Sequence, residues 1–382
     1  MERSAGYTVL AIGGYGGFGR HVSTALARDP AFDVTVAGRS AARLDAFVRN
    51  AQEEGVAVRG VVLDAQARDL AARIAATGAR AVVHSAGPFI DRDYTVARAC
   101  IAARAHYIDL ADARAFVCGI DALDAQAHDG GVLVTSGASS VPALAAAVVD
   151  AHCGSFSVLE EIHHAIAPGN QAERGLATVR SILGYTGRRF TRWEDGTWRS
   201  VHGWGNNRRF RFAPPVGTRW IADCDVPDLE LFPQRYSGVR SVTFGAGLEL
   251  RTLHFGVAAM ARLTRAGIVR DWARHAQVLL TASNWVRRLG TDAGAMSVVM
   301  RGRAPGGKRR EVIWQLIAEH GDGPRIPAQP AILIARKLAS GALAARGAVP
   351  CAGLFTLDEF TDQTRPLALR QVITVHEEGE PR

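Results

Sequence analysis

Lysine and cysteine are both scarce in this chain of 382 residues. Only Lys308 and Lys337 are lysines among 45 basic residues, so arginine supplies almost all of the positive charge. The five cysteines are widely scattered and form no C-x-x-C pair, which excludes a disulfide scaffold and a zinc ribbon. We therefore expect the protein to reside in a reducing compartment. The arginines suit the binding of phosphate and carboxylate groups.

Long hydrophobic runs and a secretion signal are also missing. No window reaches the roughly 20 uninterrupted apolar residues that a membrane-spanning helix needs. The stretch Phe255–Ile268, for example, is interrupted by Arg262 and Arg265. The segment Met1–Gly6 carries Glu2 and lacks the basic and apolar parts of a signal peptide. These absences predict a cytoplasmic protein with no membrane insertion.

The composition that remains is that of a globular protein with an excess of positive charge. Hydrophobic residues make up 48% and charged residues 21%, and the net charge is +8. Arginine and aromatic residues mix in Arg188–Trp193 and Arg208–Phe212, a pattern of nucleic-acid surfaces, although the second stretch also fits an amphipathic strand with its arginines outward. We expect an anionic small-molecule substrate and no nucleic acid.

The order of the apolar runs predicts an α/β fold with a doubly wound parallel sheet. Up to about residue 150, short β-branched runs alternate with alanine-rich stretches long enough for helices. Beyond this point turns, prolines and longer strands favour a mixed α+β domain, including a hairpin around Glu194–Gly196 and an antiparallel pair over Ser297–Arg303 and Glu311–Glu319. We predict a Rossmann domain over 1–150, a substrate and dimerisation domain over 151–325, and a helix and tail over 326–382.

A glycine-rich loop follows the first predicted strand and opens the first predicted helix. Its members are Gly13, Gly14, Tyr15, Gly16, Gly17, Phe18 and Gly19. The spacing fits G-x-G-x-x-G from Gly14 or G-x-x-G-x-x-G from Gly13. In either register bare backbone N–H groups approach a pyrophosphate at the positive end of the helix. The loop therefore predicts a dinucleotide site.

The ends of the next strands indicate which dinucleotide binds. Where an NAD-preferring fold usually has an acidic residue, this chain has Arg39 and Ser40, which suit a 2′-phosphate, so we expect NADP rather than NAD. Alternatively, Arg39 is a surface residue at a helix start. Asp64 ends the third strand, where adenine is expected. The segment after the fourth strand lies against the cofactor, or contributes Phe89 to the core; it comprises Ala86, Gly87, Pro88 and Phe89.

These motifs resemble the saccharopine dehydrogenase-like family. The glycine loop, Ala37–Arg39, Ala86–Phe89 and Tyr107–Leu110 occur in the order and approximate spacing of that family over the first 150 residues. The resemblance implies NAD(P)-dependent hydride transfer, often through an imine, and a C-terminal helix that returns to the cofactor domain. The enoyl-reductase branch of this family has a Gly-Glu pair just after the segment that corresponds to Tyr107–Leu110. This chain has Asp112–Ala113 there instead.

Catalytic candidates stand at strand ends in both domains. Tyr107 and Asp109 alternate on one strand and face the same side, which suits shared proton transfer; alternatively Asp109 caps a helix or holds a loop. His164 suits proton donation to an imine nitrogen, or is a structural histidine in a sheet. Because His163 and His164 point to opposite faces of a strand, we expect no metal.

Substrate-binding candidates are small polar residues and one arginine. Ser139 and Ser140 precede a proline in a helix start that would point N–H groups at a carboxylate, and Asn170 with Arg174 would hold a substrate carboxylate. Arg174 equally suits a solvated helix end. We expect an NADP-dependent oxidoreductase acting on an imine or secondary amine of an amino-acid-like or polyamine-like substrate, as a homodimer. The alternatives are an enoyl reductase for acyl substrates and a catalytically silent NADPH-binding protein.

Overall fold

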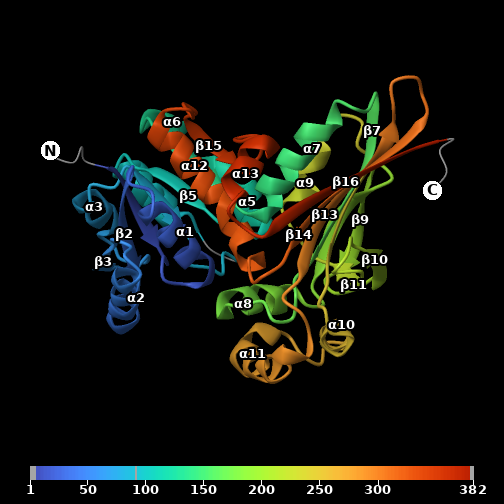
Figure 1. The fold of residues 1–382 in the computed structure, drawn as a ribbon, viewed down its shortest axis with the longest axis horizontal. Helices are drawn as coiled ribbons and strands as arrows, with labels where there is room; N and C mark the ends of the chain where they lie inside the picture. The colour runs from blue at the N-terminus through green and yellow to red at the C-terminus, as the bar shows by residue number, and fades with distance from the viewer. Residues whose placement is uncertain (1–5, 91–92, 379–382) are drawn as a thin grey trace. The chain divides into compact units, whose positions relative to one another are not determined.

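The computed structural model describes residues 6–90 and 93–378, which form two compact units (Figure 1). The residues before Gly6, on which part of the signal-peptide expectation rests, lie outside this description. Unit 1 comprises Met1–Leu144 and Arg325–Phe355, and unit 2 comprises Ala145–Pro324 and Thr356–Arg382. The segment expected as one tail over 326–382 is thus divided between the units, because its last strand pairs within the second sheet.

Unit 1 is built on a seven-stranded sheet in the order β15-β6-β5-β4-β1-β2-β3. All of its strand pairs are parallel, so the predicted doubly wound sheet is confirmed. Its order reverses between β1 and β4, the switch point where ligands of such sheets bind. The strands are β1 (Tyr7–Ile12), β2 (Phe32–Gly38), β3 (Arg59–Val62), β4 (Ala81–His84), β5 (His106–Asp109), β6 (Leu133–Ser136) and β15 (Gly347–Pro350).

Helices cover both faces of this sheet, which explains why every residue of β4 and β6 is buried. On one face, α3 and α4 join a core that includes Leu10, Tyr107 and Val134. Elsewhere α12, from the C-terminal part of the chain, packs on α1 and β5. The helices are α1 (Gly17–Ala27), α2 (Ala41–Glu53), α3 (Leu70–Ala76), α4 (Thr95–Ala102), α5 (Arg114–Cys118), α6 (Asp124–Asp129) and α12 (Gln329–Ser340).

Unit 2 is built on a mixed sheet in the order β10-β11-β12-β7-β13-β14-β16. Only β7 and β12 pair in parallel; the other pairs are antiparallel, as the second domain's mixed character predicts. The strands are β7 (Val158–Ala167), β10 (Arg208–Arg211), β11 (Thr218–Asp223), β12 (Ser241–Ala246), β13 (Gly294–Arg303), β14 (Arg309–Ala318) and β16 (Leu369–Glu377).

Two local predictions for unit 2 are confirmed. β8 (Arg189–Glu194) and β9 (Thr197–His202) form the expected hairpin, whose turn residues Asp195 and Gly196 both have positive φ. β13 and β14 form the expected long antiparallel pair. The helices are α7 (Ala145–Cys153), α8 (Leu176–Tyr185), α9 (Asp228–Arg235), α10 (Arg251–Arg265), α11 (Ala276–Trp285) and α13 (Leu357–Thr364). Within the described ranges, none of the helices is both long and apolar enough to cross a membrane.

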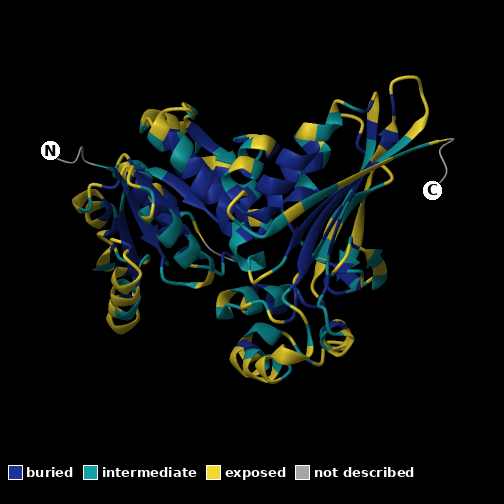
Figure 2. Ribbon diagram, in the orientation of Figure 1, coloured by how far each residue is buried: buried dark blue, intermediate teal, exposed yellow. Residues whose placement is uncertain are grey.

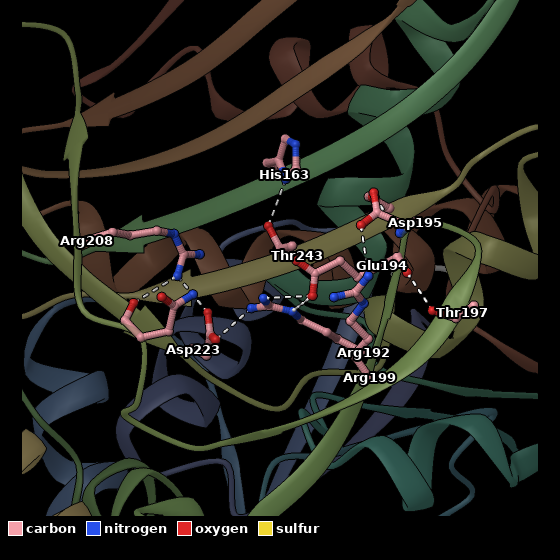
Figure 3. A network of polar contacts seen from close by, with 11 residues as sticks. His163, Arg192, Glu194, Asp195, Thr197, Arg199, Arg208, Asp223 and Thr243 are labelled. Atoms are coloured by element: carbon pink, nitrogen blue, oxygen red, sulfur yellow. Dashed lines mark hydrogen bonds and ion pairs between the residues drawn. The ribbon is translucent and has the colours of Figure 1, made fainter.

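The arginine-rich arms of unit 2 meet at a buried carboxylate, Asp223 at the end of β11 (Figure 3). Arg192 reaches one carboxylate oxygen and Arg208 the other, each at 2.6 Å, and Arg192 also pairs with Glu194. The Asp223 side chain is 2% exposed. One arginine of each arginine–aromatic stretch is therefore held by this buried carboxylate, while Arg209 and Arg211 of the second stretch are exposed.

Replacing Asp223 tests the strength of this network. Asp223→Ala leaves Arg192 and Arg208 without their shared carboxylate in a place that water reaches poorly, so the free energy of unfolding should fall by roughly 3 kcal/mol. Urea unfolding followed by circular dichroism measures this loss. The matched control is Asp362→Ala, which removes a carboxylate paired with Arg365 at 2.7 Å but 65% exposed. The control should change stability by less than about 1 kcal/mol; equal losses would contradict the assignment.

Candidate cofactor and active site

The glycine loop packs against the segment that follows β4. Gly13 has φ of +77°, and a Cβ there would lie 2.8 Å from the backbone nitrogen of Ala86. A Cβ on Gly19 would collide with the Gly13 carbonyl oxygen and the Ser85 hydroxyl. Only glycine fits these positions, because backbone approaches backbone with no room for a side chain.

The amino end of α1 is arranged for an anion. Its cap is Gly16, no side chain caps it, and no acidic residue stands in its first turn, which begins with Gly17 and Phe18. N–H groups at a helix start have no intrahelical acceptor, and the helix dipole is positive there. The glycine cradle and this helix end fit the pyrophosphate of a dinucleotide, as the loop predicts.

A cluster at the end of β2 joins the glycine loop to α2. The Ser40 N–H donates to the Tyr15 hydroxyl at 3.2 Å, and the Arg43 guanidinium lies 5.3 Å from the centre of the Tyr15 ring. Ser40 also caps α2 by accepting from the Arg43 N–H. The Arg39 side chain is exposed. Two arginines and a hydroxyl therefore gather where a 2′-phosphate is expected.

Arg43 was not among the residues expected from the sequence. A signal for it exists in the spacing, because a residue three positions after a helix cap returns to the cap's side of the helix. Gly38 is part of the same arrangement: a Cβ there would collide with the Tyr15 ring.

Asp64, expected near adenine, is exposed and accepts a hydrogen bond from the Gln66 N–H at 3.1 Å.

The segment after β4 presents small residues beside the glycine loop. Ala86 is exposed, and Gly87 and Pro88 are half-buried. Phe89 is buried, with its ring 5.0 Å from that of His84 and 5.2 Å from that of Phe116. Its contacts are those of a core residue, the alternative that the sequence left open.

Tyr107 and Asp109 lie fully buried on β5, beside the end of β4. The Tyr107 hydroxyl is 3.0 Å from Nδ1 of His84. One oxygen of Asp109, Oδ1, accepts three hydrogen bonds of 2.9 Å, from the Ala111 N–H, the Ser136 hydroxyl and the Gly137 N–H. Asp109 thus holds the loop after β6, and His84 is a member of this cluster that the sequence analysis did not single out.

Burial dominates the electrostatics of this cluster. Desolvation raises the pKa of Asp109 to about 6, against the lowering effect of the Gly137 and Ala111 N–H groups. Burial likewise raises the pKa of Tyr107, and the nearby Asp109 adds to that rise. Within the described residues the second oxygen, Oδ2 of Asp109, is buried without a hydrogen-bond partner. The carboxyl group can therefore gain or lose a proton near neutral pH.

Ser139 and Ser140 also lie in unit 1, where both are buried. The Ser139 N–H donates to the Gly137 carbonyl oxygen at 2.7 Å, and its own carbonyl oxygen accepts from the Leu144 N–H. Ser140 opens the helical turn Ser140–Leu144. The serines continue the loop that Asp109 holds, so these elements share one framework.

His164 lies in unit 2 and is enclosed on β7. Its Nδ1 is 3.3 Å from Oδ1 of Asp228, and both side chains are fully buried. The ring packs 5.1 Å from that of Phe232. His163, on the opposite face, bonds to Thr243 (Figure 3) and to Glu161. Among the described residues, no group of three or more His, Cys, Asp or Glu is placed to hold a metal ion.

Asn170 and Arg174 are joined to each other and to Glu249 in unit 2. The Arg174 guanidinium donates to the backbone carbonyl of Asn170 at 2.8 Å and to its side-chain oxygen. The Asn170 N–H donates to Glu249 at 2.6 Å, and Glu249 pairs with Arg219 at 3.0 Å. The network ties two loops to strand β11. Glu249 carried no sequence signal because it stands far from Asn170 along the chain.

Comparisons with known proteins agree with this geometry. Residues 9–135 match the family model of the saccharopine dehydrogenase NADP binding domain. No curated protein matches the chain. The fold is similar to apo saccharopine dehydrogenase (L-Glu forming) from Saccharomyces cerevisiae, with 14% identity and a TM-score of 0.66, covering 97% of this chain and 100% of that one. A meso-dapdh mutant with DAP from Clostridium tetani E88 gives 10% identity and a TM-score of 0.44, covering 94% and 99%.

Charge reversal at the end of β2 tests which coenzyme the cluster selects. Arg39→Asp should weaken NADPH binding roughly ten- to a hundredfold, the range expected for a lost charge-assisted hydrogen bond, and change NADH binding far less. Calorimetric titration with each coenzyme measures both. Arg49→Asp, the same change at an exposed position on α2, is the control and should leave both affinities unchanged. Equal losses of NADPH and NADH would remove the 2′-phosphate assignment.

The raised pKa of Asp109 predicts a pH-dependent stability. Between pH 4 and about 6 the unfolded chain has released this proton while the folded chain keeps it, so the free energy of unfolding falls as pH rises through this window. The total fall is on the order of 3 kcal/mol. Asp109→Asn keeps the Oδ1 acceptor and removes the titration, so wild type should lose stability relative to this variant between pH 4 and pH 7 in urea unfolding. Parallel stability curves would contradict the shift.

The glycine cradle, the open end of α1 and the match of the family model fall on the same residues. They imply NADP as the cofactor and an oxidoreductase as the class of enzyme. The expected resemblance is therefore confirmed where its motifs lie: residues 9–135 of this chain match the NADP-binding domain of saccharopine dehydrogenase.

Proposed function

We propose that this chain transfers hydride between NADP and an imine or secondary amine of an amino-acid-like or polyamine-like substrate. The observation that carries the proposal is the extent of the fold similarity to saccharopine dehydrogenase (L-Glu forming), which spans 97% of this chain and all of that one. The likeness includes the second unit, the part that differs among enzymes sharing a Rossmann domain. An anionic substrate is in keeping with the chain's net charge of +8.

In this proposal NADPH supplies the hydride, and the protein binds, orients and exchanges a proton. Gly13, Gly16 and Gly19 provide the bare backbone for the pyrophosphate, and Arg39 with Arg43 holds the 2′-phosphate. These contacts fix the dinucleotide along the carboxyl ends of β1 and β2, which leaves the ends of β4 and β5 for the reacting half.

Proton exchange is assigned to the buried cluster on β5. A carboxyl with a pKa of about 6, such as Asp109, can give and take a proton near neutrality. Tyr107 is hydrogen-bonded to His84, and His84 is 8% exposed whereas Tyr107 and Asp109 are not exposed at all. His84 is thus the member that a proton from outside would reach first.

His164 remains a second proposed proton donor, with Asp228 as the group that orients its ring. The proposed substrate contacts are Ser139, Ser140, Asn170 and Arg174, although Asn170 and Arg174 already bond to one another.

We also propose a homodimer. Strand β16 is the last strand in its sheet, and its Ile373 and Val375 are about half exposed, as suits an edge that pairs with a second copy.

A substrate panel with NADPH tests the reaction class. Oxidation of NADPH should accompany mixtures of 2-oxo acids with amino acids or polyamines, which form imines, and should not accompany 2-enoyl thioesters. Turnover of the thioesters alone would favour the enoyl reductase. Tight NADPH binding without turnover of any compound would favour the silent binding protein.

Two substitutions test the proton donors. Tyr107→Phe and His164→Gln should each lower kcat by at least about tenfold while sparing NADPH affinity, because a positioned acid or base contributes about 10²–10⁴-fold. Asp362→Ala, at an exposed ion pair on α13, should leave kcat unchanged. Full activity in both test variants would remove these roles and leave the coenzyme assignment standing.

A further inference from the structure

The part of unit 2 between residues 251 and 290, here called the α10–α11 region, exposes an unusual number of large apolar side chains. It is about a tenth of the chain, yet six of the eleven large apolar residues that the described structure exposes lie in it. Four are more than two-thirds exposed, with Trp285 at 83%. The six are Phe255, Leu263, Ile268, Val278, Trp285 and Leu289. Exposure on this scale marks an interaction surface.

The exposed apolar residues follow helical spacing, so each helix presents a strip to the solvent. On α11 and the turn after it, Val278, Trp285 and Leu289 are spaced by seven and four residues, with Ala282 between the first two. On α10, Phe255 and Leu263 are two turns apart, while His254, Ala258 and Ala261 are buried on the other side. Figure 2 shows exposed residues along both helices. An ordinary surface helix has a polar solvent side, whereas here large apolar side chains stand among the exposed arginines.

The two helices are tied into one structure by the turn between them. The Trp272 indole N–H donates to the Met260 carbonyl oxygen of α10 at 3.0 Å. Trp272 belongs to the 3-10 turn Trp272–His275, which leads directly into α11. The two strips are therefore carried by a connected element that α8 joins to the rest of unit 2.

The same region is strongly basic. It contains seven arginines and a single acidic residue, Asp271, giving 7 − 1 = +6 of the whole chain's net +8. All seven arginines are exposed. They are Arg251, Arg262, Arg265, Arg270, Arg274, Arg287 and Arg288. Positive charge therefore surrounds the apolar strips and is far denser here than in the rest of the molecule.

We propose that the α10–α11 region docks on an anionic lipid membrane surface. Exposed Trp, Leu and Ile side chains on short helices enter the headgroup region, and the arginines around them are attracted to anionic lipids. The docking is peripheral and requires no helix that crosses the bilayer. A second copy of this chain is a less suitable partner for the region. Two such regions in contact would each carry a net charge of +6 and would repel one another. The proposal does not depend on the reaction that the enzyme catalyses.

Vesicle sedimentation of the full chain tests the docking. The protein should sediment with vesicles of phosphatidylcholine containing 30% phosphatidylglycerol, and about tenfold less with pure phosphatidylcholine or in 0.5 M NaCl, since salt screens the attraction. Arg270→Glu with Arg288→Glu should lower partitioning by at least about tenfold. Lys308→Glu with Arg309→Glu, the same charge change in the exposed β13–β14 turn, should not.

The apolar strip is tested separately from the charge. Trp285→Ser should weaken binding to the anionic vesicles several-fold, while Trp198→Ser, at a tryptophan 47% exposed on β9, should not. Circular dichroism checks that each variant is folded. If Trp285→Ser does not fold, Val278→Ser replaces it in the same experiment. Three results would overturn the proposal: no sedimentation with either vesicle, equal sedimentation with both, or a concentration-dependent dimer that Trp285→Ser dissolves. The last would assign the strip to a second copy.

Discussion

The close approach of the glycine loop to the segment after β4 is the constraint on which unit 1 depends. Gly13 and Gly19 leave no room for a Cβ, so backbone meets backbone at the switch point of the sheet. This contact brings the start of α1, the end of β2 and the end of β4 to one edge. The positive helix end, the arginines at Arg39 and Arg43, and the buried carboxyl of Asp109 are all placed by strands that meet there. The cofactor site follows from a packing requirement before any charge is considered.

The parts of the fold that could be predicted from the sequence depend on local signals. Apolar runs, glycine spacing and the Asp195–Gly196 turn each act over a few residues, and the parallel sheet, the phosphate loop and the β8–β9 hairpin are as expected. The partners of buried polar groups could not be predicted. Asp223 collects arginines from two other strands, and Glu249 holds Asn170 from far along the chain. Such pairs are chosen by the tertiary fold, so Arg208 looked like a surface residue until its partner was known.

Two buried carboxylates, Asp223 in unit 2 and Asp109 in unit 1, have opposite surroundings. Asp223 pairs with two guanidinium groups, one from β8 and one from β10. Asp109 receives only neutral donors, and burial raises its pKa to about 6. An ion pair locks one protonation state, whereas a neutral hydrogen-bond shell leaves both states within reach at ordinary pH. The two carboxyl groups are therefore distinguished by the charge of their neighbours.

Strand β15 has a consequence for how the molecule is made. It joins the parallel sheet beside β6 although about 200 residues separate them, and α12 comes from the same late segment. During synthesis the sheet of unit 1 stays one strand short, with an open edge at β6, until Gly347–Pro350 have left the ribosome. The parallel sheet is therefore completed by a segment that the chain reaches only after most of the second unit.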